Sequence, residues 1–329
     1  MDPDITFINE KVKEESEIVE RILSEMGKII VGQRILLERM IIALVTSGHI
    51  LLEGVPGLAK TLSIKTLSQV LDLNFSRIQF TPDLLPADLT GTLVFNPKTS
   101  DFYTRRGPLF TNLLLADEIN RAPAKVQSAL LEAMQELQVT IGEKSHEIEK
   151  PFLVMATQNP IEQEGTYPLP EAQIDRFLLK IKVTYPSKEE EKDIVTKMAG
   201  SELQPVQTIC SRDDVFRMNQ SYKMVYMDER IKDYIINLVF ATRFPEEAGL
   251  EKLKNLIQFG ASPRASIYLT ETSRALAFIK RRGYVTPEDV KTIGMDVLRH
   301  RIILSYEAEA EEMTTDDIIT EIFNNIVVP

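Results

Sequence analysis

One glycine-rich segment, residues 54–61, constrains the fold of this chain more than any other part of the sequence. It reads Gly-Val-Pro-Gly-Leu-Ala-Lys-Thr and follows the apolar run 49–53, which is typical of a short buried strand. It leads into residues 61–71, where apolar side chains recur at helical spacing. A strand, a glycine-rich loop and a helix in this order predict a phosphate-binding loop, because loop N–H groups and a helix N-terminus attract anions.

Within this loop, Lys60 would reach the outer phosphates of a nucleotide and the Thr61 hydroxyl would bind magnesium. The strict pattern is not met, because Ala59 stands where a final glycine is expected. We expect Ala59 to adopt a negative φ, which costs an alanine nothing. The alternative is an ordinary Gly/Pro turn before a lysine. The nucleotide-binding residues predicted here are Gly54, Val55, Pro56, Gly57, Leu58, Ala59, Lys60, Thr61 and Leu62.

A second apolar run, residues 113–116, ends in the two acids Asp117 and Glu118. A buried strand that ends there would place both carboxylates at the carboxyl edge of the sheet, where open α/β sheets bind ligands. Asp117 would then hold the magnesium shell, and Glu118 would polarise the attacking water. The alternative is a strand end followed by an acidic helix cap. The phosphate loop upstream favours the catalytic interpretation.

Asn159 follows a further apolar run, residues 152–156. At the tip of a neighbouring strand, its side chain could orient the same water against the γ-phosphate. An Asn-Pro pair also initiates turns in its own right, so both interpretations remain open on the residues alone.

These motifs and three further segments resemble the AAA+ ATPases, and more specifically their MoxR branch. The resemblance covers almost the whole chain, and the Tyr-Pro segment before Arg176 is specific to this branch. Alanine at position 59 fits the branch as well. The segments that carry the resemblance are 54–61, 107–110 (Gly-Pro-Leu-Phe), 116–122 (Ala-Asp-Glu-Ile-Asn-Arg-Ala), 156–160 (Ala-Thr-Gln-Asn-Pro), 164–177 and 260–265 (Gly-Ala-Ser-Pro-Arg-Ala).

The resemblance implies a role for each motif residue. Lys60 and Thr61 would form the Walker A pair, the acids at 117–118 the Walker B pair, and Asn159 the first sensor. Gln79 is the candidate for the residue that couples ligand state to Glu118. The backbone around adenine would come from Val31, Gly32 and Gln33.

Two arginines complete the implied site. Arg176 matches the arginine finger, which reaches into the active site of a neighbouring subunit, and Arg264 matches the second sensor on the lid. On chemistry alone, Arg176 could equally be a surface ion-pair partner of little energetic weight. Arg264, after Ser-Pro, could be a solvated residue in the first turn of a helix.

The pattern of elements predicts an α/β fold: a P-loop NTPase (AAA+) with a parallel five-stranded sheet wrapped by helices and a C-terminal all-α lid. Residues 1–186 would form the nucleotide-binding core with an N-terminal helix, and residues 187–329 the lid. By resemblance the strand order is 5-1-4-3-2. Thr286 and Pro287 predict a helix start in the lid. The expected strands lie near 49–53, 75–80, 112–116, 152–156 and 178–183.

Two hairpins are expected to interrupt the core, at 93–104 and 139–148. The first has the turn signal Asn-Pro-Lys, and the second has a polar Gly-Glu-Lys-Ser tip. On the residues alone, plain surface loops are favoured over a functional role. The resemblance implies that both face the central pore of a ring, where they could press on a client protein.

Composition limits the number of domains, the compartment and the kinds of partner expected for the chain. With 329 residues it is long enough for two domains. Its only cysteine is Cys210, so no disulfide can form within it and a reducing cytoplasm is expected. No run approaches the about 20 apolar residues of a membrane span. The formal charge of −11 argues against a surface that binds nucleic acid.

These features favour a magnesium-dependent ATPase that works as a homo-oligomeric ring, expected to be a hexamer. The resemblance implies a chaperone-like role, in which partner proteins are remodelled, matured or loaded with a metal or cofactor, sometimes together with a von Willebrand factor A domain protein. One alternative is the motor subunit of a magnesium chelatase-like enzyme. Another is a scaffold that binds ATP but hydrolyses it negligibly. Net charge disfavours a DNA-acting clamp loader or initiator.

Overall fold

The computed structural model describes residues 5–55, 57–159, 166–200 and 205–329. They fall into two compact units. The sheet unit comprises Ile18–Phe177 and Ile181–Phe216. The helical unit comprises Met1–Glu17, Leu178–Lys180 and Arg217–Pro329. The predicted domain boundary after residue 186 stays a prediction.

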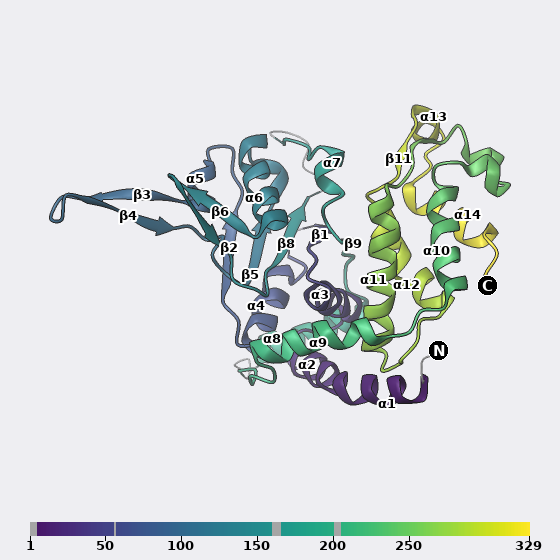
Figure 1. The fold of residues 1–329 in the computed structure, drawn as a ribbon, viewed down its shortest axis with the longest axis horizontal. Helices are drawn as coiled ribbons and strands as arrows, with labels where there is room; N and C mark the ends of the chain where they lie inside the picture. Colours follow the sequence, from purple (N-terminus) through teal and green to yellow (C-terminus); the bar gives the residue numbers. More distant parts are fainter. Residues whose placement is uncertain (1–4, 56, 160–165, 201–204) are drawn as a thin grey trace. The chain divides into compact units, whose positions relative to one another are not determined.

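A five-stranded sheet carries the fold, in the order β2-β5-β8-β1-β9 (Figure 1). The pairs β2–β5, β5–β8 and β8–β1 are parallel. This order confirms the expected 5-1-4-3-2 arrangement, and each strand lies within two residues of its predicted place. The central strands are almost wholly apolar because helices bury both of their faces. The strands are β1 (Ile50–Glu53), β2 (Phe75–Gln79), β5 (Leu113–Asp117), β8 (Leu153–Gln158) and β9 (Leu179–Lys182).

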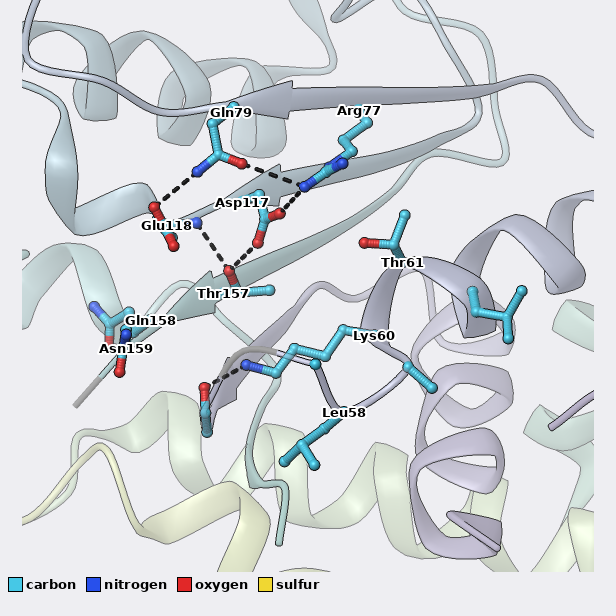
Figure 2. A pocket seen from close by; sticks show the side chains of 14 residues that line it. Leu58, Lys60, Thr61, Arg77, Gln79, Asp117, Glu118, Thr157, Gln158 and Asn159 are labelled. Carbon is cyan, nitrogen blue, oxygen red and sulfur yellow. Dashed lines mark hydrogen bonds and ion pairs between the residues drawn. The ribbon is translucent and has the colours of Figure 1, made fainter. Parts of the chain in front are cut away.

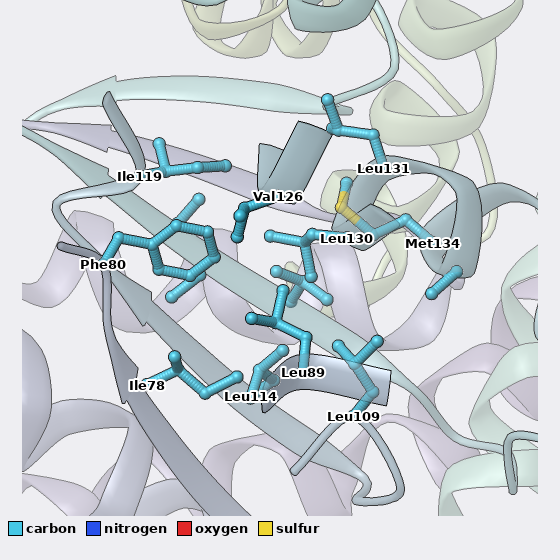
Figure 3. Close-up of a cluster of buried hydrophobic side chains, with 14 of the residues drawn as sticks. Ile78, Phe80, Leu89, Leu109, Leu114, Ile119, Val126, Leu130, Leu131 and Met134 are labelled. Carbon is cyan, nitrogen blue, oxygen red and sulfur yellow. The ribbon is translucent and has the colours of Figure 1, made fainter. Parts of the chain in front are cut away.

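Alternate side chains of each strand serve opposite faces of the sheet. On one face, Leu114 and Ile78 pack in a fully apolar cluster with Leu89 of helix α5 and with Val126 and Leu130 of helix α6 (Figure 3). On the other face, α4 contacts β5. The helices of this unit are α2 (Glu17–Gly27), α3 (Arg34–Val45), α4 (Lys60–Val70), α5 (Pro86–Thr90), the 3₁₀ helix η1 (Ile119–Arg121), α6 (Ala124–Glu136), α7 (Glu171–Ile174) and α8 (Lys188–Gly200). Helix α9 (Arg212–Ser221) begins in this unit, and its residues from Arg217 on belong to the helical unit.

Both predicted hairpins form. β3 (Gly91–Asn96) pairs with β4 (Asp101–Arg106), and this hairpin extends away from the sheet (Figure 1). The rings of Phe95 and Phe102, opposite each other in the ladder, lie 5.2 Å apart. β6 (Gln138–Ile141) pairs with β7 (Lys144–Glu147).

The second unit is mainly helical and includes a two-stranded antiparallel ladder of β10 (Ile257–Phe259) and β11 (Ile303–Leu304). The helix start predicted at Thr286 is confirmed, and Asp289 completes a capping box there. No helix among the described residues is long and apolar enough to cross a membrane. The helices are α1 (Ile5–Glu15), η2 (Tyr222–Met224), α10 (Glu229–Ala241), η3 (Pro245–Ala248), η4 (Glu251–Leu253), α11 (Pro263–Ile279), α12 (Pro287–Leu298), α13 (Tyr306–Ala310) and α14 (Thr315–Asn325).

Candidate active site

A pocket of about 410 Å³ lies at the carboxyl ends of β1, β2, β5 and β8 in the sheet unit (Figure 2). Its volume is within the range of pockets that bind small molecules. Ligands of open α/β sheets bind at this edge, because the loops that follow the strands converge there. The lining residues are Gly54, Gly57, Leu58, Ala59, Lys60, Thr61, Leu62, Arg77, Gln79, Asp117, Glu118, Thr157, Gln158 and Asn159.

Lys60 is the first residue of α4 and lies in this pocket. Its Nζ donates a hydrogen bond of 2.5 Å to the carbonyl oxygen of Gly54, within the same loop. Burial lowers the pKa of Lys60, while the charges of Asp117 and Glu118 act in the opposite direction. An anion that enters the pocket could replace the Gly54 carbonyl as the partner of this amine.

The loop backbone differs from expectation at Ala59. The predicted negative φ is wrong, because Ala59 has φ 56° and ψ 15°, in the left-handed region. Gly57, two residues earlier, also has a positive φ, of 88°. Turns of this kind point successive N–H groups into one concavity, which is an anion-binding arrangement. A left-handed conformation costs an alanine about 1–2 kcal/mol in free energy. The predicted phosphate loop therefore contains a strained residue.

The remaining predicted loop residues have different surroundings. A Cβ on Gly54 would lie 2.6 Å from the carbonyl oxygen of Val183, so close packing requires glycine. Val55 does not line the pocket, and Pro56 lies outside the described residues. Leu58, Thr61 and Leu62 line the pocket.

Both carboxylate oxygens of Asp117 are occupied by side chains from the neighbouring strands. Oδ1 accepts a hydrogen bond of 2.7 Å from the Thr157 hydroxyl on β8. Oδ2 accepts one of 2.6 Å from Arg77 on β2. The Thr157 hydroxyl also accepts a bond of 2.8 Å from the backbone N–H of Glu118, so one buried hydroxyl positions both acids.

Two side chains contact the carboxylate of Glu118. Its Oε2 accepts a hydrogen bond of 2.8 Å from Gln79 Nε2 and lies 3.3 Å from the guanidinium of Arg121. Its backbone is left-handed, with φ 56°. Gln79 therefore contacts Glu118, and its coupling role stays a prediction.

Arg77 and Thr157 are pocket residues to which the sequence interpretation gave no role. Arg77 stands two residues before Gln79 on β2, so the two share a face of the strand. The sequence could therefore have indicated that Arg77 lies beside Gln79 at the same edge of the sheet. Thr157 was visible only as part of a polar strand end, and its contact with Asp117 depends on β5 and β8 being neighbours.

The oxygen and nitrogen groups of the pocket fit a magnesium nucleotide. Thr61 offers a hydroxyl and Asp117 a carboxylate, which are the hard oxygen ligands that Mg²⁺ prefers alongside phosphate oxygens and water. Lys60 and the N–H groups at the start of α4 suit the phosphates.

Asn159 also lines the pocket, and it is 8% exposed. The predicted adenine segment is not among the lining residues. Gln33 instead lines a second pocket of about 290 Å³ with residues 181–186, and its amide donates to the Thr184 carbonyl at 3.3 Å. Val31 and Gly32 line neither pocket.

Neither predicted arginine is among the residues that line this pocket. Arg176 follows α7, and its guanidinium donates a hydrogen bond of 3.1 Å to the Leu131 carbonyl on α6. Arg264 lies in the first turn of α11, where its N–H donates to the Ser262 hydroxyl that caps the helix. It belongs to the helical unit, so its role toward the pocket stays a prediction.

Known proteins resemble the chain over both units. A family model described as the ATPase family associated with various cellular activities (AAA) matches residues 49–179, and an AAA lid domain model matches residues 253–322. Chaperone MoxR1 of Mycobacterium tuberculosis is 50% identical, over 96% of this chain and 83% of its own. YeaC of Bacillus subtilis, uncharacterised, is 41% identical over 93% of both chains. A crystal structure of a candidate ATPase from Cytophaga hutchinsonii has a TM-score of 0.92 and 51% identity over 97% of each chain.

The sheet order, the phosphate loop and the lid match together define an AAA-type nucleotide-binding ATPase fold. The chain belongs to the MoxR family of AAA+ ATPases. This confirms the family resemblance of the sequence motifs.

Proposed function

We propose that the chain binds ATP with Mg²⁺ in the pocket at the strand ends and hydrolyses it. The observation that carries the proposal is the convergence of Lys60, Thr61, Asp117 and Glu118 on one cavity, the first two from the start of α4 and the acids from the end of β5. Each of these side chains is the type that phosphoryl transfer to water requires.

The chemical roles follow from position. Lys60 and the loop N–H groups hold the outer phosphates, while Thr61 and Asp117 hold Mg²⁺, which neutralises charge on the phosphate oxygens. Glu118 polarises the attacking water after it leaves Gln79, because a carboxylate tied to an amide donor is a weaker base. Asn159 orients the water from the end of β8.

In this proposal, a neighbouring subunit supplies one further positive charge to the phosphates. Arg176 does not line the pocket of its own chain, which supports a role as an arginine finger in trans. Such a finger contributes about 10³–10⁵ in rate. The active assembly is then a homo-oligomeric ring, with six subunits expected and with Arg264 as the second sensor on the lid.

The ring would use ATP to remodel or mature partner proteins. The β3–β4 hairpin supports this, because its aromatic side chains are exposed, Phe95 by 50%, Phe102 by 61% and Tyr103 by 52%. A relative of the chain is named a chaperone. A von Willebrand factor A domain protein is the proposed partner class, and a reducing cytoplasm the proposed compartment.

The test is the ATPase rate per subunit across a wide range of protein concentration, with and without Mg²⁺. We expect a rate that requires Mg²⁺ and rises with concentration, since each site needs a neighbour. Nucleotide binding without turnover at any concentration would contradict hydrolysis and favour a scaffold. The matched control is Lys60→Ala, which should be inactive throughout.

A further inference from the structure

The Arg77 side chain makes two contacts in the pocket that the proposed function leaves unused (Figure 2). Its Nη2 donates at 2.6 Å to Asp117 Oδ2 and at 3.3 Å to Gln79 Oε1. The side chain of Arg77 is 49% exposed, and that of Asp117 is 19% exposed. One guanidinium thus contacts both the carboxylate predicted to hold Mg²⁺ and the amide that holds Glu118.

The contact with Asp117 puts Arg77 in competition with a metal ion. Thr157 already occupies Oδ1, so a cation that approaches the carboxylate meets Arg77 on Oδ2. The two positive charges repel at such short range. An ion pair this exposed contributes little to stability, so Mg²⁺ with a nucleotide could displace the arginine readily.

The contact with Gln79 fixes which end of the amide faces Glu118. An amide oxygen only accepts hydrogen bonds and the NH₂ group only donates. Because Oε1 receives the Arg77 donor, Nε2 is directed at Glu118 Oε2, at 2.8 Å. Withdrawal of Arg77 removes one of the contacts that orient the amide.

We propose that Arg77 is a positioning residue that links metal binding at Asp117 to the release of Glu118. In the nucleotide-free protein it is the counter-ion of Asp117 and orients Gln79 toward Glu118. When Mg²⁺ and a nucleotide arrive, Arg77 leaves Asp117 and the Gln79–Glu118 bond weakens. This inference rests on the proposed function of the same pocket.

The first experiment measures the Kd of the fluorescent nucleotide mant-ADP as a function of free Mg²⁺. Arg77→Met and Arg77→Gln remove the competing charge, and we expect the midpoint of the Mg²⁺ dependence to fall about two- to fivefold. Arg77→Lys keeps the charge and should stay near the wild-type midpoint. The matched control is Arg212→Met, because Arg212 also forms an exposed pair, with Glu149 at 3.0 Å, and its midpoint should not move.

An unchanged or higher midpoint in both neutral variants would overturn the proposal, while leaving the proposed function intact if the wild type binds mant-ADP. Equal shifts in Arg77→Met and Arg77→Lys would overturn it too, since charge would not be the cause. Absence of mant-ADP binding by the wild type would contradict the proposed function itself.

A double-mutant cycle tests the link to Glu118. The kcat at saturating Mg²⁺ and ATP is measured for Arg77→Met, Gln79→Ala and the double variant. If Arg77 acts through Gln79, its substitution has no further effect once Gln79 is gone. Additive effects on kcat would contradict the link.

Discussion

The phosphate loop contains Lys60, and the acids Asp117 and Glu118 at the end of β5 form what we call the carboxylate edge. Both line the same pocket, but their polar groups find hydrogen-bond partners in different ways. In the loop, Lys60 donates to the carbonyl oxygen of Gly54 within the same loop, and the backbone at Ala59 is strained. At the edge, Asp117 and Glu118 accept hydrogen bonds from side chains of both neighbouring strands. The loop has the backbone arrangement of an anion site, whereas the acids are already hydrogen-bonded within the protein.

The largest expected effect concerns the carboxylate edge. Glu118→Gln should bind ATP with unchanged affinity and lose about 10²–10⁴ in kcat, because a general base is removed while the phosphate contacts remain. Single-turnover ATP hydrolysis measures this directly. Glu136→Gln, an exposed residue at the end of α6, is the matched control and should keep full activity. A Glu118→Gln variant that turns over ATP normally would contradict the assigned role.

The next prediction distinguishes the binding role of the phosphate loop from the catalytic role of the carboxylate edge. Lys60→Ala should weaken ATP binding by about 10- to 150-fold, since a hydrogen bond to a charged group contributes about 1.5–3 kcal/mol. Titration with mant-ATP gives the Kd. Equal ATP affinity in Lys60→Ala and Glu118→Gln would remove the distinction between a binding loop and a catalytic edge.

Thr157 tests whether the acids are held by the strands. Thr157→Val keeps the volume but leaves Asp117 Oδ1 and the Glu118 N–H without their hydroxyl partner. We expect a loss of about 1–3 kcal/mol in the free energy of unfolding, measured with denaturant. Thr157→Ser retains the hydroxyl and should lose much less. Equal losses in the two variants would assign the effect to packing.

The smallest expected effect concerns strain in the loop. Ala59→Gly relieves a left-handed alanine and should raise the free energy of unfolding by up to about 1 kcal/mol. Ala129→Gly, inside α6, is the matched control and should lower it by about 1 kcal/mol. A destabilised Ala59→Gly variant would show that the loop is not strained.

The sequence predicted those features that depend on residues close together in the chain. Strands β1, β5 and β8 were found because buried parallel strands are continuous apolar runs, and Lys60 because its loop is a local motif. Arg77 and Thr157 were missed because the expected strand order gives neighbouring strands but not the register that brings these side chains to Asp117. The sign of φ at Ala59 was wrong because alanine itself favours the opposite conformation.

The predicted adenine-binding segment is a second case in which the sequence did not predict the contacts of a residue. Gln33 contacts Thr184 across many intervening residues, and the pocket there is separate from the one that holds Lys60. Its contact with nucleotide remains a prediction, as does that of Arg264 on the other unit.

The most direct test of the account is a mixing experiment with two inactive variants. Arg176→Ala should bind ATP normally yet hydrolyse it poorly, because it keeps its own pocket and lacks the finger, while Glu118→Gln keeps the finger and lacks the base. In a mixed ring, a Glu118→Gln subunit can supply Arg176 to an intact pocket next to it. We predict that the ATPase rate of the mixture exceeds the sum of the two separate rates. A mixture no more active than that sum, or full activity of Arg176→Ala alone, would contradict a site completed by its neighbour.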